Sequence, residues 1–294
     1  MQARHSEIAG SKHRGFFSSF NYVTLIGGQL VALAVLIILQ HMLPPAAMAE
    51  WGWRIPFVIG AGLAVVAFWL RRRMQESQSF LSTDAPAAER GSPRLLLRRY
   101  PRETLTILGL TAGGSMIFYV YTTYMQKFLT NTAGFSKADA TELSAATLIA
   151  FMVAQPLCCW LSDRIGRRRM LLIAFGGGVL ITWPVMTRLA ATSSIGVAFL
   201  LILAAVLFES AYTSISAVVK AELFPTNLRS LGVALPYALA NALFGGTAEY
   251  VALWFKSAGA ENGFYIYASA LSAVSFLAAL TMRDTRIHSR ILED

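Results

Sequence analysis

The feature that most constrains this chain is a series of apolar segments, each long enough to cross a lipid bilayer. A transmembrane helix needs about 20 predominantly apolar residues. Eight segments approach or exceed that length, at about 16–42, 54–70, 104–126, 142–161, 170–188, 196–219, 230–255 and 263–282. Only 14% of the residues are charged, whereas soluble domains have about 25%. The sequence therefore predicts an all-α integral membrane protein with eight spans.

Basic residues are divided unequally between the two sides of the membrane. Placing both termini on one side gives that side 20 of the 25 lysines and arginines. The other side keeps Arg54, Lys127, Lys137, Arg188 and Lys256. Because cytoplasmic loops carry the basic excess, both termini are expected in the cytoplasm. The formal net charge of +9 then reflects membrane topology and calls for no nucleic acid partner.

Polar residues recur along the spans with a period of three. The second, fifth and eighth spans carry no side-chain amide or charge, whereas the others carry polar groups suited to a wet interior. Every third helix is therefore expected to face lipid, while the helices between them line a pathway. Counted in threes from the C-terminus, the first group has two spans, so the chain is expected to be truncated at its N-terminus.

One long polar connection separates the second span from the third. It is rich in Ser, Ala, Pro and charged residues, a composition typical of linkers. The sequence therefore predicts three parts: a partial N-terminal bundle of two spans over 1–70, a cytoplasmic linker over 71–102, and a six-span bundle with a short cytoplasmic tail over 103–294.

Two connections on the predicted cytoplasmic side combine acidic and basic residues. The first reads "CWLSDRIGRRRM", in which Asp163 can accept charge-assisted hydrogen bonds from Arg164, Arg167 or a helix N-terminus. The second reads "KAELFPTNLRSLG" and holds Glu222 and Arg229. Ion pairs in both loops suit a gate on one face of the membrane. A structural anchor is an equal alternative, and the first loop can also be a plain basic loop.

The first loop is similar to the signature G-x-x-x-D-R/K-x-G-R/K-R/K of the major facilitator superfamily, with Cys159 in place of the first glycine. The second resembles the E-x-F-P-x-x-x-R signature of many members. Three further stretches, "RGFFSSFNYVTLIGGQL" with "WGWRIPF", "FYVYTTYMQKFLTNTAG" and "NALFGGTAEYVAL", resemble the metabolite:proton symporter branch and, within it, the 2-oxoglutarate (alpha-ketoglutarate) permeases. The resemblance covers almost all of residues 7–283.

This resemblance implies twelve spans in two six-helix halves, of which this chain would hold the last two of the N-half and the complete C-half. It implies proton-driven uptake of 2-oxoglutarate or a related dicarboxylate across the bacterial inner membrane. No cofactor or metal is expected beyond the proton gradient, and the oligomeric state is left open. The truncated chain is expected to be inactive alone. The alternatives are a non-transporting membrane fragment that binds or interacts, or a symporter of another small carboxylate or an osmolyte.

An enzyme is not expected, because the four histidines lie in the tails or at a span edge, without a metal or nucleophile motif.

Two carboxylates within the spans are candidates for proton coupling, since a charge in hydrocarbon is costly. Glu249 shares a helix face with Asn241 and Gly245. Three readings stay open for it: a protonated or gating carboxyl, an ion pair that fixes helix packing, with Lys256 as a possible partner, or an exposed interfacial residue. Glu209 is the second and weaker candidate.

A polar stripe follows the sixth span at helical spacing, with Thr213, Ser216 and Lys220 following Glu209. In the third span, one face offers Tyr119, Thr123 and Gln126, although tyrosines are also common at membrane interfaces. The substrate-cavity candidates are Tyr119, Thr123, Gln126, Thr213, Ser216 and Asn241. Because no span carries a cation at mid-depth, the main cation that anchors the substrate is expected outside this chain.

Overall fold

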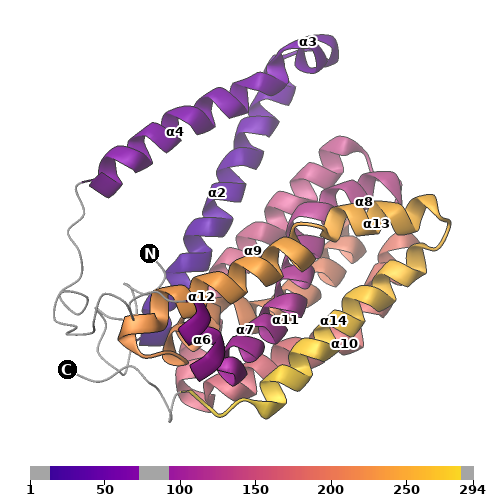
Figure 1. Ribbon diagram of the computed structural model, residues 1–294. Helices are drawn as coiled ribbons and strands as arrows, with labels where there is room; N and C mark the ends of the chain where they lie inside the picture. Colours follow the sequence, from indigo (N-terminus) through magenta and orange to yellow (C-terminus); the bar gives the residue numbers. More distant parts are fainter. Residues whose placement is uncertain (1–13, 73–92, 286–294) are drawn as a thin grey trace.

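The computed structural model describes residues 14–72 and 93–285 as a set of long helices (Figure 1). Eight helical segments of the described chain are long and apolar enough to cross a membrane, which confirms the predicted spans. They are Ser19–Met42, Gly52–Leu70, Pro101–Asn131, Lys137–Ile165, Arg167–Ala190, Ile195–Glu222, Leu228–Ser257 and Glu261–Thr281.

The first two spans are α2 (Arg14–Met42) and α4 (Ile55–Arg72), joined by the short helices α3 (Pro45–Glu50) and η1 (Gly52–Arg54). Proline suits the first turn of a helix, and Pro45 begins α3 directly after α2 has ended. The long helix α2 packs along α9 and α11, whereas α4 contacts α2 and η1 and leaves its apolar side chains exposed (Figure 1).

Part of the predicted linker is helical. Residues 73–92 lie outside the described residues, but α6 (Pro93–Arg99) forms just before the third span. Leu96 of α6 is fully buried in a small apolar cluster with Ile107, Phe224 and Val233. This end of the linker is therefore anchored to the six-helix bundle by packing.

The remaining elements form that bundle. They are α7 (Pro101–Tyr119), η2 (Val120–Tyr124), α8 (Met125–Asn131), α9 (Lys137–Ile165), α10 (Arg167–Ala190), α11 (Ile195–Glu222), α12 (Thr226–Ala240), η3 (Asn241–Gly245), α13 (Ala248–Ser257) and α14 (Glu261–Thr281). The third span continues to Asn131 rather than to about residue 126. It does so because Phe128 and Leu129, beyond the polar pair Gln126 and Lys127, are fully buried.

Two spans change their helical winding partway along. The segments η2 and η3 are single π-helical turns, inserted between α7 and α8 and close to the start of α13. Such turns often occur at functional sites. Both lie next to α7, and η3 packs directly against it. Neither was predicted, because residue periodicity does not separate a π-turn from the α-helix around it.

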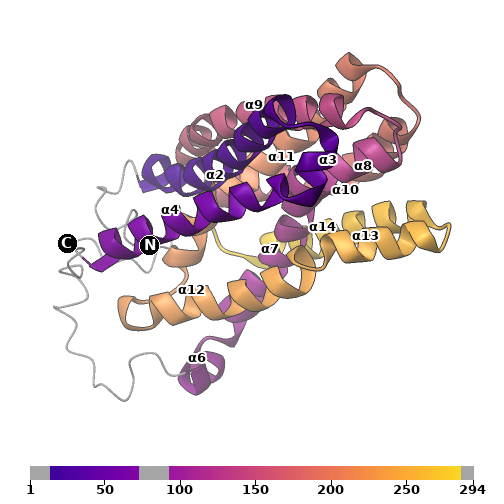
Figure 2. The same ribbon diagram turned by 90° about the horizontal axis from the view of Figure 1, so that it is seen from above.

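The fifth and eighth spans, two of the three that the sequence predicts to be apolar, lie together on one side of the bundle. Helices α10 and α14 pack against each other on the side away from α2 (Figure 1), and they expose Leu180 and Leu277. Figure 2 shows α2 and α9 running side by side, with α12, α13 and α14 on the opposite side of α7. The polar stripe of α11 thus lies in the interior.

Candidate functional site

The stripe on α11 is buried along its whole length. Glu209, Thr213, Ser216 and Lys220 have exposed fractions of 3%, 0%, 2% and 2%. Their common face meets α2, α7 and α9, all of which pack on α11. One helix therefore carries a carboxylate, two hydroxyls and an ammonium group into the interior of the bundle.

Lys220 is a buried cation, and no carboxylate of the described residues forms an ion pair with it. Its Nζ donates a hydrogen bond of 3.2 Å to the Tyr212 hydroxyl. The same Nζ lies 4.2 Å from the centre of the Tyr237 ring and 5.5 Å from that of Tyr212, and aromatic faces attract cations. No other hydrogen bond of Lys220 occurs among the described residues. An ammonium group has three donors, so two remain for an anion.

The burial of Lys220 was not apparent from the sequence, because this residue lies in the last turn of α11. Position along a helix does not determine burial, however. Tyr237 of α12 and Tyr212 of α11 enclose the ammonium group, and only the packing of α12 against α11 brings the first of these tyrosines to it.

Tyr212 is held in place by close packing. A Cβ atom added to Gly114 of α7 would overlap the Tyr212 ring. The Phe175 ring of α10 lies 5.0 Å away from it, centre to centre. Glycine at position 114 therefore allows α7 to approach closely enough to fix the hydroxyl that receives the Lys220 hydrogen bond.

Glu209 lies near the middle of α11, and its Oε1 atom has no hydrogen-bond partner in the described part of the chain. Leaving a buried carboxylate oxygen unpaired is costly. One turn further along, the Thr213 hydroxyl donates to Gln155 Oε1 of α9 at 3.0 Å. The amide of α9 is thus engaged beside Glu209, while the carboxyl itself retains an open position.

The other residues predicted to line a substrate cavity lie in separate parts of the bundle. Asn241 Oδ1 accepts a hydrogen bond of 2.8 Å from the Ser115 hydroxyl, and a Cβ atom on Gly245 would overlap the Tyr119 ring, so η3 and α7 meet here. Thr123 is exposed, beside Thr122.

Gln126 lies farther along the third span, apart from the contact between Asn241 and Ser115. Its Nε2 donates to the Thr141 hydroxyl of α9 at 2.7 Å. The six candidates therefore form no single cluster within the described residues.

Glu249 forms an ion pair with Lys127 of α8. The two side chains are 33% and 53% exposed, so the carboxylate is neither deeply buried nor unpaired. Lys256, the partner considered from the sequence, instead donates to the Asn131 carbonyl at 2.7 Å and lies 3.9 Å from Glu261. The turn at η3 starts a new helix, and Glu249 in its first turn faces α8.

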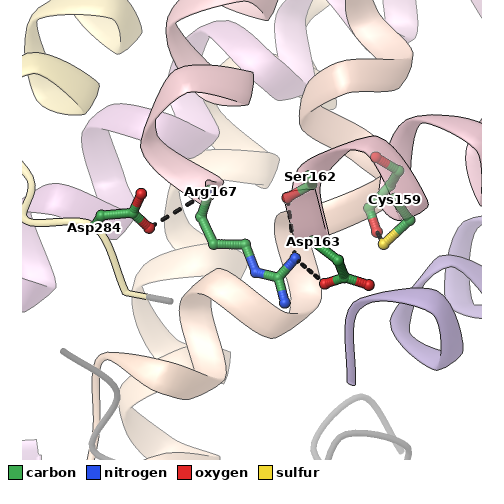
Figure 3. Close-up of polar contacts among 6 residues, drawn as sticks. Cys159, Ser162, Asp163, Arg167 and Asp284 are labelled. Carbon is green, nitrogen blue, oxygen red and sulfur yellow. Dashed lines mark hydrogen bonds and ion pairs between the residues drawn. The ribbon is translucent and has the colours of Figure 1, made fainter. Parts of the chain in front are cut away.

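At the α9–α10 connection, Arg167 is the partner of Asp163 (Figure 3). Its Nη1 donates to Asp163 Oδ1 at 2.6 Å and to the Ser162 hydroxyl at 3.0 Å. Gly166 between them has φ of +101°, a backbone conformation that only glycine adopts readily. The other candidate, Arg164, places its guanidinium 3.9 Å from the centre of the Trp160 ring.

A further carboxylate, Asp284, completes this cluster and was not singled out in the sequence. Its Oδ1 accepts a hydrogen bond of 3.2 Å from the backbone N–H of Arg167, at the start of α10 (Figure 3). Arg168 in turn donates to the Leu280 carbonyl, 2.6 Å away at the end of α14. A negative charge is favourable at a helix N-terminus and a positive charge at a helix C-terminus. Asp284 therefore stabilises the start of α10, and Arg168 stabilises the end of α14.

The α11–α12 connection also buries its charged residues. Glu222 and Arg229 are 4% and 3% exposed, and Arg229 Nε donates to the Phe224 carbonyl at 3.3 Å. An ion pair between the two, and a gating role for either connection, remain predictions.

Eight apolar helices, packed around a buried polar stripe, define a multi-pass helical membrane protein. The family model of the Major Facilitator Superfamily matches residues 1–248 and 126–292. The chain belongs to this superfamily, which confirms the prediction from the loop motifs.

Two relatives and one solved structure place the chain more closely. It is 49% identical to the alpha-ketoglutarate permease of Escherichia coli (strain K12) over 94% of its length. It is 28% identical to the citrate-proton symporter of Salmonella typhi over 96% of its length. The solved structure of the proton:xylose symporter XylE shares its fold, with a TM-score of 0.72, 18% identity and 96% of this chain covered.

The chain spans 63%, 65% and 66% of these three proteins, respectively. All three are transporters, in agreement with the expectation that the chain is not an enzyme.

Proposed function

We propose that this chain serves in the proton symport of a dicarboxylate such as 2-oxoglutarate across the bacterial inner membrane, with both termini in the cytoplasm. The observation that carries the proposal is Lys220, a buried ammonium group with two spare donors. The similarity to the alpha-ketoglutarate permease supports the choice of substrate.

The chemistry of this site fits a carboxylate. A buried charge costs several kcal/mol unless it is paired, and a substrate carboxylate supplies both the opposite charge and acceptors for the spare Lys220 donors. The Tyr212 and Tyr237 rings exclude water from the ammonium group. The proton gradient drives the cycle, and no cofactor takes part.

The remaining polar positions would line the route to this site. Tyr119, Asn241 and Gln126 come first from the predicted outer side, and Thr213 and Ser216 lie closer to Lys220. The loop residues Asp163, Arg164, Arg167, Glu222 and Arg229 would form a cytoplasmic gate. Alternating access requires two bundles that rock around a central site, so the chain alone would bind substrate without translocating it.

The test is uptake of labelled 2-oxoglutarate by cells that lack their own uptake system. The cells express this chain alone, or this chain fused to the part of the Escherichia coli permease that it does not match. We expect uptake with the fusion only, loss of uptake with Lys220→Met, and partial recovery with Lys220→Arg. Uptake by the chain alone would contradict the need for a second bundle. A well-expressed fusion that neither binds nor takes up 2-oxoglutarate would refute the dicarboxylate assignment.

A related carboxylate is the second candidate, favoured by the similarity to the citrate-proton symporter. An excess of unlabelled citrate that abolishes uptake more effectively than unlabelled 2-oxoglutarate would favour it. An osmolyte would be favoured if unlabelled betaine competed instead. Binding by the purified fusion without any uptake would identify a non-transporting binding protein.

A further inference from the structure

We propose that a pocket on the predicted outer side of the bundle binds an anionic group, either a carboxylate or a phosphate. The pocket lies where the end of α2 meets the turn from α8 to α9. Lys220 belongs to the last turn of α11, and the spans α9, α10 and α11 separate the two places along the chain. The pocket is therefore a second site, at the opposite end of the bundle (Figure 1).

The pocket is small and rich in hydrogen-bond donors. Its volume is about 200 Å³, below the range of about 300–1,000 Å³ that is common for drug-sized ligands. It is lined by two lysines, three amides and two hydroxyls, namely Lys127, Lys137, Gln40, Gln126, Asn131, Thr130 and Thr141. None of these described lining residues is a carboxylate. The composition therefore favours a small anion over a cation or an apolar ligand.

The turn between α8 and α9 brings these donors together. Gly134 in this turn has φ of +77°, a conformation that suits glycine. The hydrogen bond of 2.7 Å from Gln126 Nε2 to the Thr141 hydroxyl ties α8 to α9. Lys137 and Thr141 are four residues apart and share one face of α9. Gln40 comes from α2, which packs along α9, so three elements contribute to one space.

The positive charge of the pocket is only partly compensated. Glu249 forms an ion pair with Lys127. Within the described residues, neither the ammonium group of Lys137 nor the side-chain amide of Asn131 has a hydrogen bond or an ion pair. A cleft lined by one sign of charge attracts ions of the other sign. An anion here would accept hydrogen bonds from Lys137 and Asn131 without displacing Glu249.

Two sources of such an anion reach this side of the membrane. One is a dicarboxylate in the outer solution, and the other is the phosphate of an anionic lipid headgroup in the outer leaflet. Both present negatively charged oxygens, which accept charge-assisted hydrogen bonds from lysine. The chemistry of the site is therefore the same for both, and only their route to it differs.

An anion in this pocket would connect the two predicted bundles. Gln40 belongs to the partial N-terminal bundle, whereas Lys137 belongs to the six-span bundle. Gln126, at the outer end of the proposed route, also lines the pocket. A dicarboxylate held here would lie where the route to Lys220 begins, and this consequence alone rests on the proposed function.

The experiment measures ligand binding to this chain and to the purified fusion in lipid nanodiscs. Both proteins carry Lys220→Met, which removes the proposed inner site. Saturation-transfer NMR detects bound 2-oxoglutarate in nanodiscs of phosphatidylcholine, and inorganic phosphate is added as a competitor. Native mass spectrometry measures the lipid that each protein retains from nanodiscs with added phosphatidylglycerol.

We expect 2-oxoglutarate to bind, and inorganic phosphate or added salt to weaken this binding. Lys137→Gln should lower the affinity by up to about fivefold, the effect of losing a partly exposed ion pair. Lys137→Glu should abolish binding, and Lys137→Arg should retain it. Arg188→Gln is the matched control, because it removes a positive charge from the same predicted side but outside the pocket. It should leave binding unchanged.

Phosphatidylglycerol distinguishes the two sources. If lipid occupies the pocket, added phosphatidylglycerol suppresses 2-oxoglutarate binding, and Lys137→Glu retains less of this lipid than the protein with Lys137. If a dicarboxylate from solution is the occupant, phosphatidylglycerol leaves 2-oxoglutarate binding unchanged.

The inference is overturned if Lys137→Glu alters neither 2-oxoglutarate binding nor lipid retention, or if Arg188→Gln reduces them as strongly. A fusion that binds 2-oxoglutarate through Lys137, but shows neither uptake nor any binding that depends on Lys220, would instead refute the proposed function. The two failures are thus distinguishable.

Discussion

At the scale of single residues, Gly114 determines the position of Tyr212, whose hydroxyl accepts the Lys220 hydrogen bond. A Cβ atom there would overlap the Tyr212 ring, which is buried and packed against Phe175. Gly114→Ala is therefore expected to destabilise the protein by about 1–3 kcal/mol, a typical cost of overpacking, and to weaken 2-oxoglutarate binding. Thermal unfolding in detergent and a binding assay measure both effects.

The control for this change is Gly28→Ala on α2, where an added Cβ atom meets nothing within 4 Å. Both positions are helical, so the gain in helix propensity is common to the two variants. Equal melting temperatures for Gly114→Ala and Gly28→Ala would show that the contact with Tyr212 is not tight.

The pair of Lys127 and Glu249 is expected to contribute little to stability. Partly exposed ion pairs typically contribute about 0.2–1 kcal/mol, and both partners are substantially exposed. A double-mutant cycle with Lys127→Met and Glu249→Gln should give a coupling energy in that range, which decreases with added salt. A coupling energy of several kcal/mol would mean that the pair is shielded from water. Glu249 would then again be a candidate for the substrate pathway.

At the scale of elements, the α9–α10 turn depends on one glycine. Gly166 has φ of +101°, and a side chain there would also meet the Asp284 carboxylate. Holding another residue in such a conformation costs of order 1–3 kcal/mol. We expect Gly166→Ala to lower the melting temperature and to loosen the contact between α10 and the end of α14.

Gly134→Ala is the control that separates backbone strain from the contact with Asp284. Gly134 also has a positive φ, of +77°, but a Cβ atom there meets nothing within 4 Å. Gly166→Ala should therefore be the more destabilising of the two. An equal loss would assign the whole effect to the backbone and none to Asp284.

The helices themselves were largely predictable at this scale. Each span is a long apolar run, and such a run in lipid has to satisfy its backbone hydrogen bonds internally. The helix α6 within the predicted linker was not predicted, because its stability comes from burying Leu96 under α7 and α12. The π-turns η2 and η3 were missed for the same reason, since their neighbours, and not their composition, define them.

At the scale of the whole molecule, α10 and α14 are expected to face lipid, on the side away from α2. Leu277 of α14 is 60% exposed, whereas Ser272, five residues earlier, is 1% exposed. A lipid-dissolved diazirine, which on illumination gives a carbene that inserts into C–H bonds, should therefore label Leu277 and leave Ser272 unlabelled. Protection of Leu277 in lipid, together with labelling of Ser272, would place α14 at the centre of the protein.

The sequence by itself determined the spans, their number and the superfamily, because each of these depends on local composition and on loop motifs that are read directly along the chain. It also identified the stripe that begins at Glu209, since helical spacing alone puts those residues on one face. Only the tertiary structure decided which charges meet. Lys220 became a buried cation through Tyr237 of another helix, and Glu249 paired with Lys127 rather than Lys256. Pairings of this kind depend on how helices far apart in the sequence pack together, and no local pattern encodes that packing.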